Sequence, residues 1–181
     1  MLIHPDKSLL LVIDIQEKLV PAIYQKEQLV DNCKWLLEIA NVIGVPVMAS
    51  EQYPQGLGHT VPAINDQIDP EMVLEKLHFS CMSEPECNRR INEHRPDQVI
   101  LIGMEAHVCV LQTAMQLKQQ AREVFVVADC VSSRSAEDKS LALDRLRANG
   151  IHIVSREMVA FEWMQKSGTD QFKKISKEYL R

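Results

Sequence analysis

Short apolar runs alternate with longer segments whose apolar residues recur at helical spacing, and this alternation limits the fold more than any other feature of the sequence. The apolar runs predict strands at residues 8–15, 46–49, 72–76, 98–102, 124–128 and 151–154. The helical pattern covers residues 28–42, 83–94, 110–121, 136–148, 157–165 and 170–179. Strands that alternate with helices pair in parallel, because each helix carries the chain back across the sheet. We therefore predict a Rossmann-like α/β fold with three α/β/α layers and a doubly wound, mostly parallel six-stranded sheet.

The chain of 181 residues is long enough for a sizeable core and contains no repeat or linker-like segment, so we expect a single domain over residues 1–181. Gly44 is expected to stop the helix at 28–42. Ser83 and Glu86 are expected to form a capping box at the start of the helix at 83–94. Residues 52–62, which hold two glycines and two prolines, are expected to form a loop.

The charge distribution and the cysteine count narrow the function classes. The net charge is −5 and the Lys and Arg residues are scattered, so we expect no nucleic-acid partner. No apolar run is long enough to span a bilayer and the first residues do not form a signal peptide, so we expect no membrane contact. Five cysteines without a secretory signal favour reduced thiols. We predict a cytoplasmic protein that acts on a small molecule.

Cys109 lies where the buried strand at 98–102 gives way to a helix. In an open α/β sheet, ligands bind at this carboxyl edge. The positive end of the following helix is expected to lower the pKa of the thiol, which favours a nucleophile. The alternative is a small buried hydrophobic residue. That alternative is favoured for Cys33, Cys87 and Cys130.

Two charged residues end neighbouring strands and are expected to lie near Cys109. Asp14 ends a strand of otherwise apolar residues, where a carboxylate needs either a partner or a chemical role. Its alternative interpretation is a helix N-cap. Lys76 ends a short strand and is either a solvated surface residue or a cation that holds the carboxylate and stabilises developing negative charge.

The remaining polar residues suggest a pocket rather than a metal or cofactor site. His107 is two residues from Cys109 on a turn, so we assign it to a pocket or an interface rather than to the catalytic base. His59 and Glu51 share a loop without forming a compact cluster, and no glycine-rich phosphate motif is present, so we expect no metal and no cofactor. The candidate pocket residues are Gln16, Gln52, Tyr53, His78, Phe79 and His107.

Three motifs in this order resemble the isochorismatase-like cysteine hydrolase superfamily over nearly the whole chain. They are Val-Ile-Asp-Ile-Gln at 12–16, Lys76, and Gly-Met-Glu-Ala-His-Val-Cys-Val at 103–110. The stretch at 51–62 is similar to the subgroup of isochorismatase domain-containing proteins.

The resemblance implies a catalytic triad. Asp14 would be the general base, Cys109 would be the nucleophile that forms a thioester with an amide-type substrate, and Lys76 would stabilise charge and position Asp14. The resemblance also implies a non-proline cis bond between Met104 and Glu105. The backbone N–H groups of Glu105 and Cys109 would form the oxyanion hole.

Three function hypotheses remain open at this point. The stretch at 51–54 lacks the histidine of the nicotinamidase metal site, which argues against that activity. The first hypothesis is a cysteine hydrolase of C–N bonds, the second is a vinyl-ether hydrolase of the isochorismate type, and the third is a catalytically inactive oligomeric scaffold. The family commonly forms homo-oligomers, so we expect a dimer or a larger assembly. A subunit contact or the chain's own core would take up Met158, Phe161, Trp163 and Met164.

Overall fold

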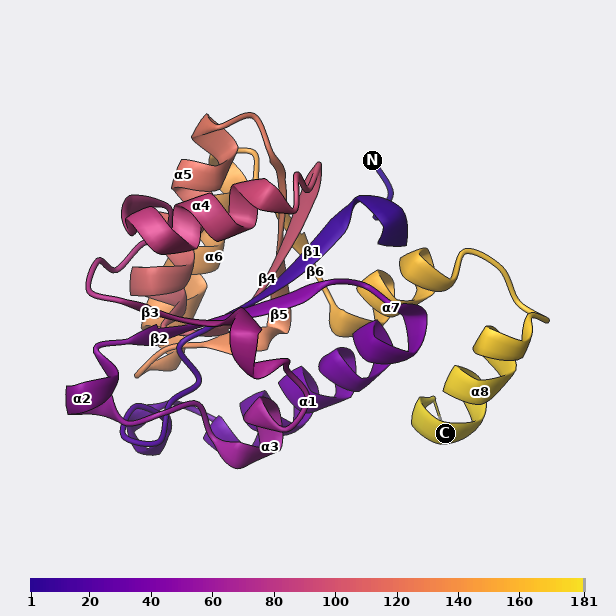
Figure 1. Cartoon of the computed structure of the whole chain (residues 1–181), viewed down its shortest axis with the longest axis horizontal. Helices are drawn as coiled ribbons and strands as arrows, with labels where there is room; N and C mark the ends of the chain where they lie inside the picture. The colour runs from indigo at the N-terminus through magenta and orange to yellow at the C-terminus, as the bar shows by residue number, and fades with distance from the viewer. Residues whose placement is uncertain (181) are drawn as a thin grey trace.

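The computed structural model describes residues 1–180, and its centre is a sheet of six parallel strands in the order β3-β2-β1-β4-β5-β6. The strands are β1 Ser8–Ile13, β2 Val47–Gln52, β3 Val73–Lys76, β4 Gln98–Met104, β5 Glu123–Ser132 and β6 His152–Val154. All five strand pairs are parallel, so the predicted α/β sheet is confirmed. Figure 1 shows the sheet running through the centre of the molecule.

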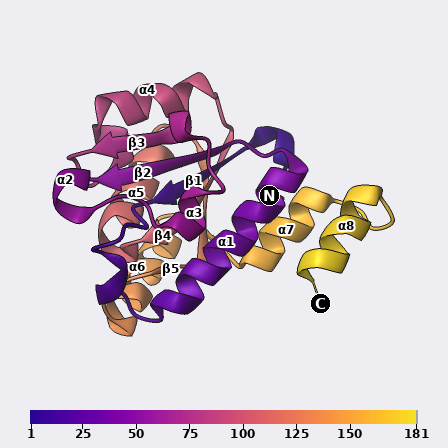
Figure 2. The same cartoon turned by 60° about the horizontal axis from the view of Figure 1, so that its bottom comes forward.

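Helices cover both faces of this sheet. They are α1 Lys26–Ile43, α2 Pro54–Leu57, α3 Pro62–Asn65, α4 Pro85–Glu93, α5 Leu111–Gln119, α6 Ala136–Ala148, α7 Arg156–Met164 and α8 Asp170–Tyr179. Helices α1, α7 and α8 lie along one face, and α4, α5 and α6 cover the other (Figure 2). The three predicted layers are therefore present.

The apolar runs form strands because both of their faces are buried. Along β1, Leu10 and Val12 pack with α1 and α7, whereas Leu9, Leu11 and Ile13 pack with α4 and α5. Side chains alternate between the two faces of a strand, so a continuous apolar run supplies two hydrophobic layers at once.

Several predicted element ends differ from the structure. The expected capping box at Ser83 and Glu86 is wrong, because α4 begins only at Pro85, a residue whose fixed φ suits the first helical position. The expected loop at 52–62 is also wrong in part, since it contains α2 and begins α3. Gly44 does stop α1: it adopts a left-handed φ of 89° and donates its N–H to the carbonyl of Ala40.

Gly103 lies against the backbone of β1 with no room for a side chain. Its φ is 119°, and a Cβ at this position would come within 2.1 Å of the carbonyl oxygen of Ile13. Only glycine fits here. The close approach sets the end of β4 beside the end of β1, which is where Asp14 follows.

The apolar residues near the C-terminus divide into two sets. Trp163 and Met164 are buried, and Trp163 Nε1 donates to Ser8 Oγ at 3.0 Å. Met158 and Phe161 remain about half exposed. The chain's own core thus takes up the first two, and a subunit contact stays a prediction for the last two. Within residues 1–180, no helix combines the length and apolar character that crossing a bilayer requires.

Candidate active site

Asp14 directly follows β1 and is fully buried. Its backbone turns there with a φ of 52°, and its N–H donates to the carbonyl of Ser50 at 3.1 Å. Its carboxylate accepts a hydrogen bond from Ser50 Oγ at 2.7 Å on one oxygen and from Lys76 Nζ at 2.8 Å on the other. The carboxylate is used by side chains from other strands, so the N-cap interpretation is wrong.

Lys76 is the last residue of β3, and its side chain points inward from the edge of the sheet. Its Nζ donates to Asp14 at 2.8 Å, to Gln52 Oε1 at 2.6 Å and to the carbonyl of Phe79 at 3.0 Å. An ammonium group has three donors, and all three are used. The ammonium is buried with a complete set of partners, which rules out the solvated surface lysine.

Cys109 lies in a π-helical turn at Ala106–Val110, between β4 and α5. The turn is wider than an α-helical one, and the Val110 N–H donates to the carbonyl of Glu105 five residues back at 3.2 Å. The Cys109 side chain is buried, and its thiol lies close enough to Asp14 and Lys76 for these charges to shift its pKa. The structure therefore brings the three predicted residues together in one buried cluster.

Burial and charge act in opposite directions on the two ionised groups. Burial raises the pKa of Asp14 above its usual 3.8, although Lys76, Ser50 and Cys109 partly offset it. Burial alone would lower the pKa of Lys76, but the attraction of Asp14 and of the nearby thiols outweighs it and raises that pKa. Asp14 is thus a stronger base than an exposed aspartate, and Lys76 stays charged.

The expected lowering of the Cys109 pKa is wrong. Burial raises the pKa of this thiol, and the negative charge of Asp14 raises it further, while Lys76 offsets only part of the effect. The thiol accordingly holds its proton at rest. A nucleophilic role then requires a base that removes the proton during attack, and Asp14 is the carboxylate whose charge acts on this thiol.

The segment before Cys109 carries the predicted cis bond between Met104 and Glu105. The Glu105 carboxylate is nearly buried and accepts a hydrogen bond from Arg134 Nε at 2.5 Å. The oxyanion-hole role of the backbone N–H groups of Glu105 and Cys109 remains a prediction.

The six candidate pocket residues occupy three kinds of position. Gln16 and Gln52 are buried and bonded inside the protein: the Gln16 side chain donates to the Gln52 carbonyl at 3.0 Å and accepts from the Gln52 N–H at 2.7 Å. They fix the end of β2. Tyr53, His78 and Phe79 are exposed around Lys76.

The sixth candidate, His107, is bonded away from the thiol. Its Nδ1 lies 2.9 Å from Ser133 Oγ, so its ring is held by the end of β5. This contact agrees with the prediction that His107 is not the base for Cys109.

A pocket of about 180 Å³ opens beside Lys76. It is lined by Pro54, Gln55, Glu75, Lys76, Leu77 and Glu84. These residues come from α2, from the end of β3 with the residue after it, and from the residue that precedes α4. The lining residues Pro54 and Leu77 are sequence neighbours of the candidate pocket residues Tyr53 and His78, which do not themselves line the pocket.

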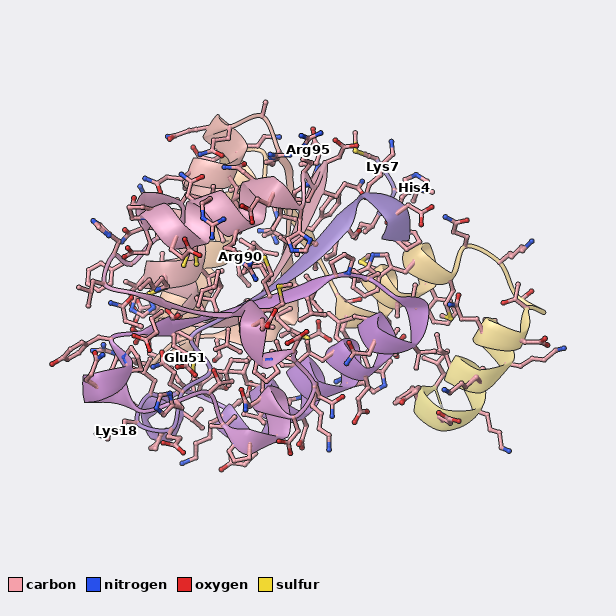
Figure 3. The ribbon with its side chains drawn as sticks, in the orientation of Figure 1. His4, Lys7, Lys18, Glu51, Arg90 and Arg95 are labelled. Carbon is pink, nitrogen blue, oxygen red and sulfur yellow. The ribbon has the colours of Figure 1, made fainter. Side chains whose placement is uncertain are left out.

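Glu51 occupies the position where a metal site was considered. One carboxylate oxygen accepts from the N–H and hydroxyl of Thr60 at 2.6 and 2.8 Å, and the other lies 2.9 Å from His59 Nδ1. Glu51 thus fastens the loop after α2 to β2. Figure 3 shows it on the side opposite His4, Lys7 and Arg95, which lie near the amino ends of the strands. Among residues 1–180, no group of three His, Cys, Asp or Glu side chains is placed to hold a metal ion.

The roles of two polar residues of the site were not predicted from the sequence. Ser50 pairs in register with Ile13 across β2 and β1, which puts its hydroxyl beside Asp14. Gln52 was expected in the pocket but serves as an acceptor for Lys76. Both residues lie at the polar end of β2, which runs beside β1 and Asp14, and this polarity is the sequence signal that could have indicated their roles.

The chain is similar to isochorismatase proteins over most of its length. The family model of the isochorismatase domain matches residues 8–158. Isochorismatase domain-containing protein 2 of Danio rerio is 39% identical over 171 residues, covering 94% of this chain and 85% of that protein.

Two solved structures show the same fold. MAR1 ribonuclease from Caenorhabditis elegans is 34% identical with a TM-score of 0.92, and the match covers 100% of this chain and 93% of that one. The YcaC gene product of Escherichia coli, an octameric hydrolase of unknown specificity, also has a TM-score of 0.92. It is 17% identical, and the match covers 99% of this chain and 91% of that one.

Proposed function

The chain belongs to the isochorismatase family, and on that premise we propose that it is a hydrolase that cleaves an amide-type C–N bond of a small molecule through a thioester. Cys109 is the nucleophile, Asp14 is the base and Lys76 positions Asp14. The observation that carries the proposal is the buried cluster in which Asp14 accepts a hydrogen bond from Lys76 and lies close enough to the Cys109 thiol to shift its pKa.

The first half of the reaction forms the thioester. Asp14 removes the thiol proton as Cys109 Sγ attacks the carbonyl carbon of the substrate. The negative charge that develops on the carbonyl oxygen is stabilised by backbone N–H donors at the start of the turn, for which Glu105 and Cys109 are the candidates. The C–N bond then breaks, the leaving nitrogen takes the proton from Asp14, and ammonia or an amine departs.

The second half returns the enzyme to its starting state. Asp14, again a carboxylate, removes a proton from a water molecule, and the resulting hydroxide attacks the thioester carbonyl. The C–S bond breaks, the acid product leaves, and the proton on Asp14 returns to Cys109. One carboxylate serves both halves, which its raised pKa favours, because the optimal base has a pKa closer to the working pH.

Lys76 contributes by holding Asp14 rather than by contacting the substrate. All three of its N–H donors are used within the protein, so a bond to a substrate oxygen would require one of them to be given up. Its fixed positive charge 2.8 Å from Asp14 keeps the carboxylate ionised in a buried site.

The test is ammonia release from a panel of small primary amides, compared between the wild type and Cys109→Ala. Release by the wild type that is lost in the variant supports the proposal. Turnover of a vinyl ether that survives in Cys109→Ala would favour the second hypothesis. The absence of any turnover, together with an unreactive Cys109, would favour the inactive scaffold.

The name of the Caenorhabditis elegans relative supplies a competing activity, which the same preparations can test. A net charge of −5 disfavours the binding of a polyanion such as RNA. Cleavage of a short RNA by the wild type and not by Cys109→Ala would replace the amidase proposal with a nuclease one.

We also propose that the protein is a homo-oligomer. The octameric state of the YcaC protein and the half-exposed Met158 and Phe161 support this assignment. Light-scattering mass measurement tests it, and a monomeric mass would contradict it. We also propose a cytoplasmic location, which the five cysteines and the expected lack of a secretory signal support.

A further inference from the structure

A second pocket lies at the carboxyl end of β5, apart from Asp14, Lys76 and Cys109. Its volume is about 330 Å³, within the range of small-molecule sites. Side chains from the first turns of α1, the end of β5 and the first half of α6 line it. In Figure 2 the amino end of α1 lies beside α6 and β5, which is where these segments meet.

Lys139 of α6 lines this pocket and is half-buried. Over residues 1–180, its ammonium has no salt bridge and no hydrogen-bond acceptor, unlike that of Lys76. Burial lowers the pKa of Lys139, and the neighbouring Asp129, Cys130 and Cys33 offset this only in part. A cation that the protein leaves without a partner gains the most from an anion supplied by a ligand.

The carboxylate of Asp129 also lines this pocket, and it is already used by another residue. Its Oδ1 accepts the N–H of Arg156 at 2.8 Å, and its Oδ2 lies 3.7 Å from Arg156 Nε. Arg156 also donates to Asn32 Oδ1, and Asn32 in turn donates to the carbonyl of Asp129. These contacts draw Asp129 toward α7 and leave Lys139 unpaired.

The rest of the lining indicates what else a ligand would contain. Leu29, Val131 and Leu143 supply apolar surface. Gln25 and Gln28 stand at the rim, where their exposed amides can donate hydrogen bonds. The lining therefore combines the unpaired positive charge of Lys139, the carboxylate of Asp129 that already pairs with Arg156, neutral donors and an apolar wall.

We propose that this pocket binds a small organic anion, a carboxylate or a phosphate monoester with an apolar body, whose charged group pairs with Lys139. The site is independent of the reaction at Cys109. The apolar body rests against Leu29 and Leu143, and the rim amides donate to the remaining oxygens of the anion.

Calorimetric titration tests this site with three probes of similar size: benzoate, phenyl phosphate and neutral benzyl alcohol. The expected result is that at least one anion binds the wild type and Cys109→Ala equally, and that benzyl alcohol binds at least about tenfold more weakly. Stronger binding of benzoate assigns a carboxylate site, and stronger binding of phenyl phosphate assigns a phosphate site.

Variants of Lys139 locate the binding. Lys139→Met is expected to weaken binding of the anion by about tenfold or more, whereas Lys139→Arg is expected to retain most of the affinity. The control variant Lys34→Met, on the exposed face of α1, is expected to leave the affinity unchanged. Thermal unfolding confirms that each variant is folded. No binding of either anion to the wild type, or equal binding to Lys139→Met, would overturn the proposal.

Discussion

Two lysines near the carboxyl ends of the strands are treated in opposite ways. Lys76 is buried among three acceptors, and its pKa is raised. Lys139 is half-buried beside an open pocket without an acceptor in the described residues 1–180, and its pKa is lowered. The first belongs to a closed network with Asp14 and Cys109, whereas the second faces a cavity.

The contrast separates a lysine that positions a catalytic residue from a lysine that can bind a ligand. A buried charge whose donors are all used cannot take a new partner without losing an old one, so Lys76 serves to fix the charge and orientation of Asp14. A cation with free donors can take a ligand at little structural cost. The same residue type at one edge of the sheet thus serves two purposes, and variants in the two regions test this division.

The largest effect is expected at Cys109, and Cys130, a thiol in the other region, serves as its control. Cys109→Ala removes the nucleophile, and turnover of any amide substrate is expected to fall by on the order of 10³-fold or more. Cys130→Ala, in the core beside the second pocket, is expected to leave turnover nearly unchanged. Steady-state ammonia release measures both. Equal losses in the two variants would end the assignment of Cys109.

The two lysines should also differ in their contribution to stability. Lys76→Met leaves the Asp14 carboxylate buried without its counter-ion, so the free energy of unfolding is expected to fall by about 3–5 kcal/mol. Lys139→Met removes a charge whose lowered pKa indicates that the folded state disfavours it. The free energy of unfolding of this variant is expected to stay within about 0.5 kcal/mol of the wild-type value or to rise above it.

Urea unfolding of both lysine variants measures this difference, and the wild type serves as the reference. A larger loss of stability for Lys139→Met than for Lys76→Met would reverse the comparison between the two lysines.

A smaller effect is expected at Ser50. Its hydrogen bond stabilises the ionised form of Asp14 and lowers the Asp14 pKa, so Ser50→Ala should raise that pKa. Because the base must be ionised to act, the acid limb of the kcat/KM profile should lie above pH 3.8 in the wild type and at still higher pH in the variant. A limb that shifts toward lower pH in Ser50→Ala would contradict the assignment of Asp14 as the base.

The smallest effect is expected at His107. Its ring lies against Ser133 rather than against Cys109, so His107→Ala should change kcat/KM much less than Ser50→Ala does. A loss as large as that of Cys109→Ala would instead make His107 the base and remove that role from Asp14.

The sequence predicted the sheet and the three central side chains because these depend on patterns that leave little choice. Apolar runs of strand length must be buried on both faces, and parallel strands bring their carboxyl ends to one edge. Asp14, Lys76 and Cys109 each stand at such an end, so their meeting follows from topology. The boundaries of α6, at Ala136–Ala148, also agree with the expected helix.

The features that could not be predicted depend on the register of strand pairing and on the burial of individual side chains. The end of β5 was missed because Asp129 and Cys130 interrupt its apolar run, yet the strand continues and pairs Ser132 with Met104 after an irregularity. The pKa of Cys109 was predicted with the wrong sign because burial and the charge of Asp14 outweigh a helix end. Neither the burial nor the register of Ser50 beside Ile13 is visible in the residue pattern.

The most direct test of the central claim is acylation of Cys109 by a small p-nitrophenyl ester, followed by intact and peptide mass spectrometry. This ester reports proton removal from the thiol, because its leaving group needs no proton. The account predicts one acyl group on Cys109 in the wild type and, in Asp14→Asn, acylation slowed by on the order of 10²-fold or more. Equal rates in the two proteins, or acylation at a different residue, would contradict it.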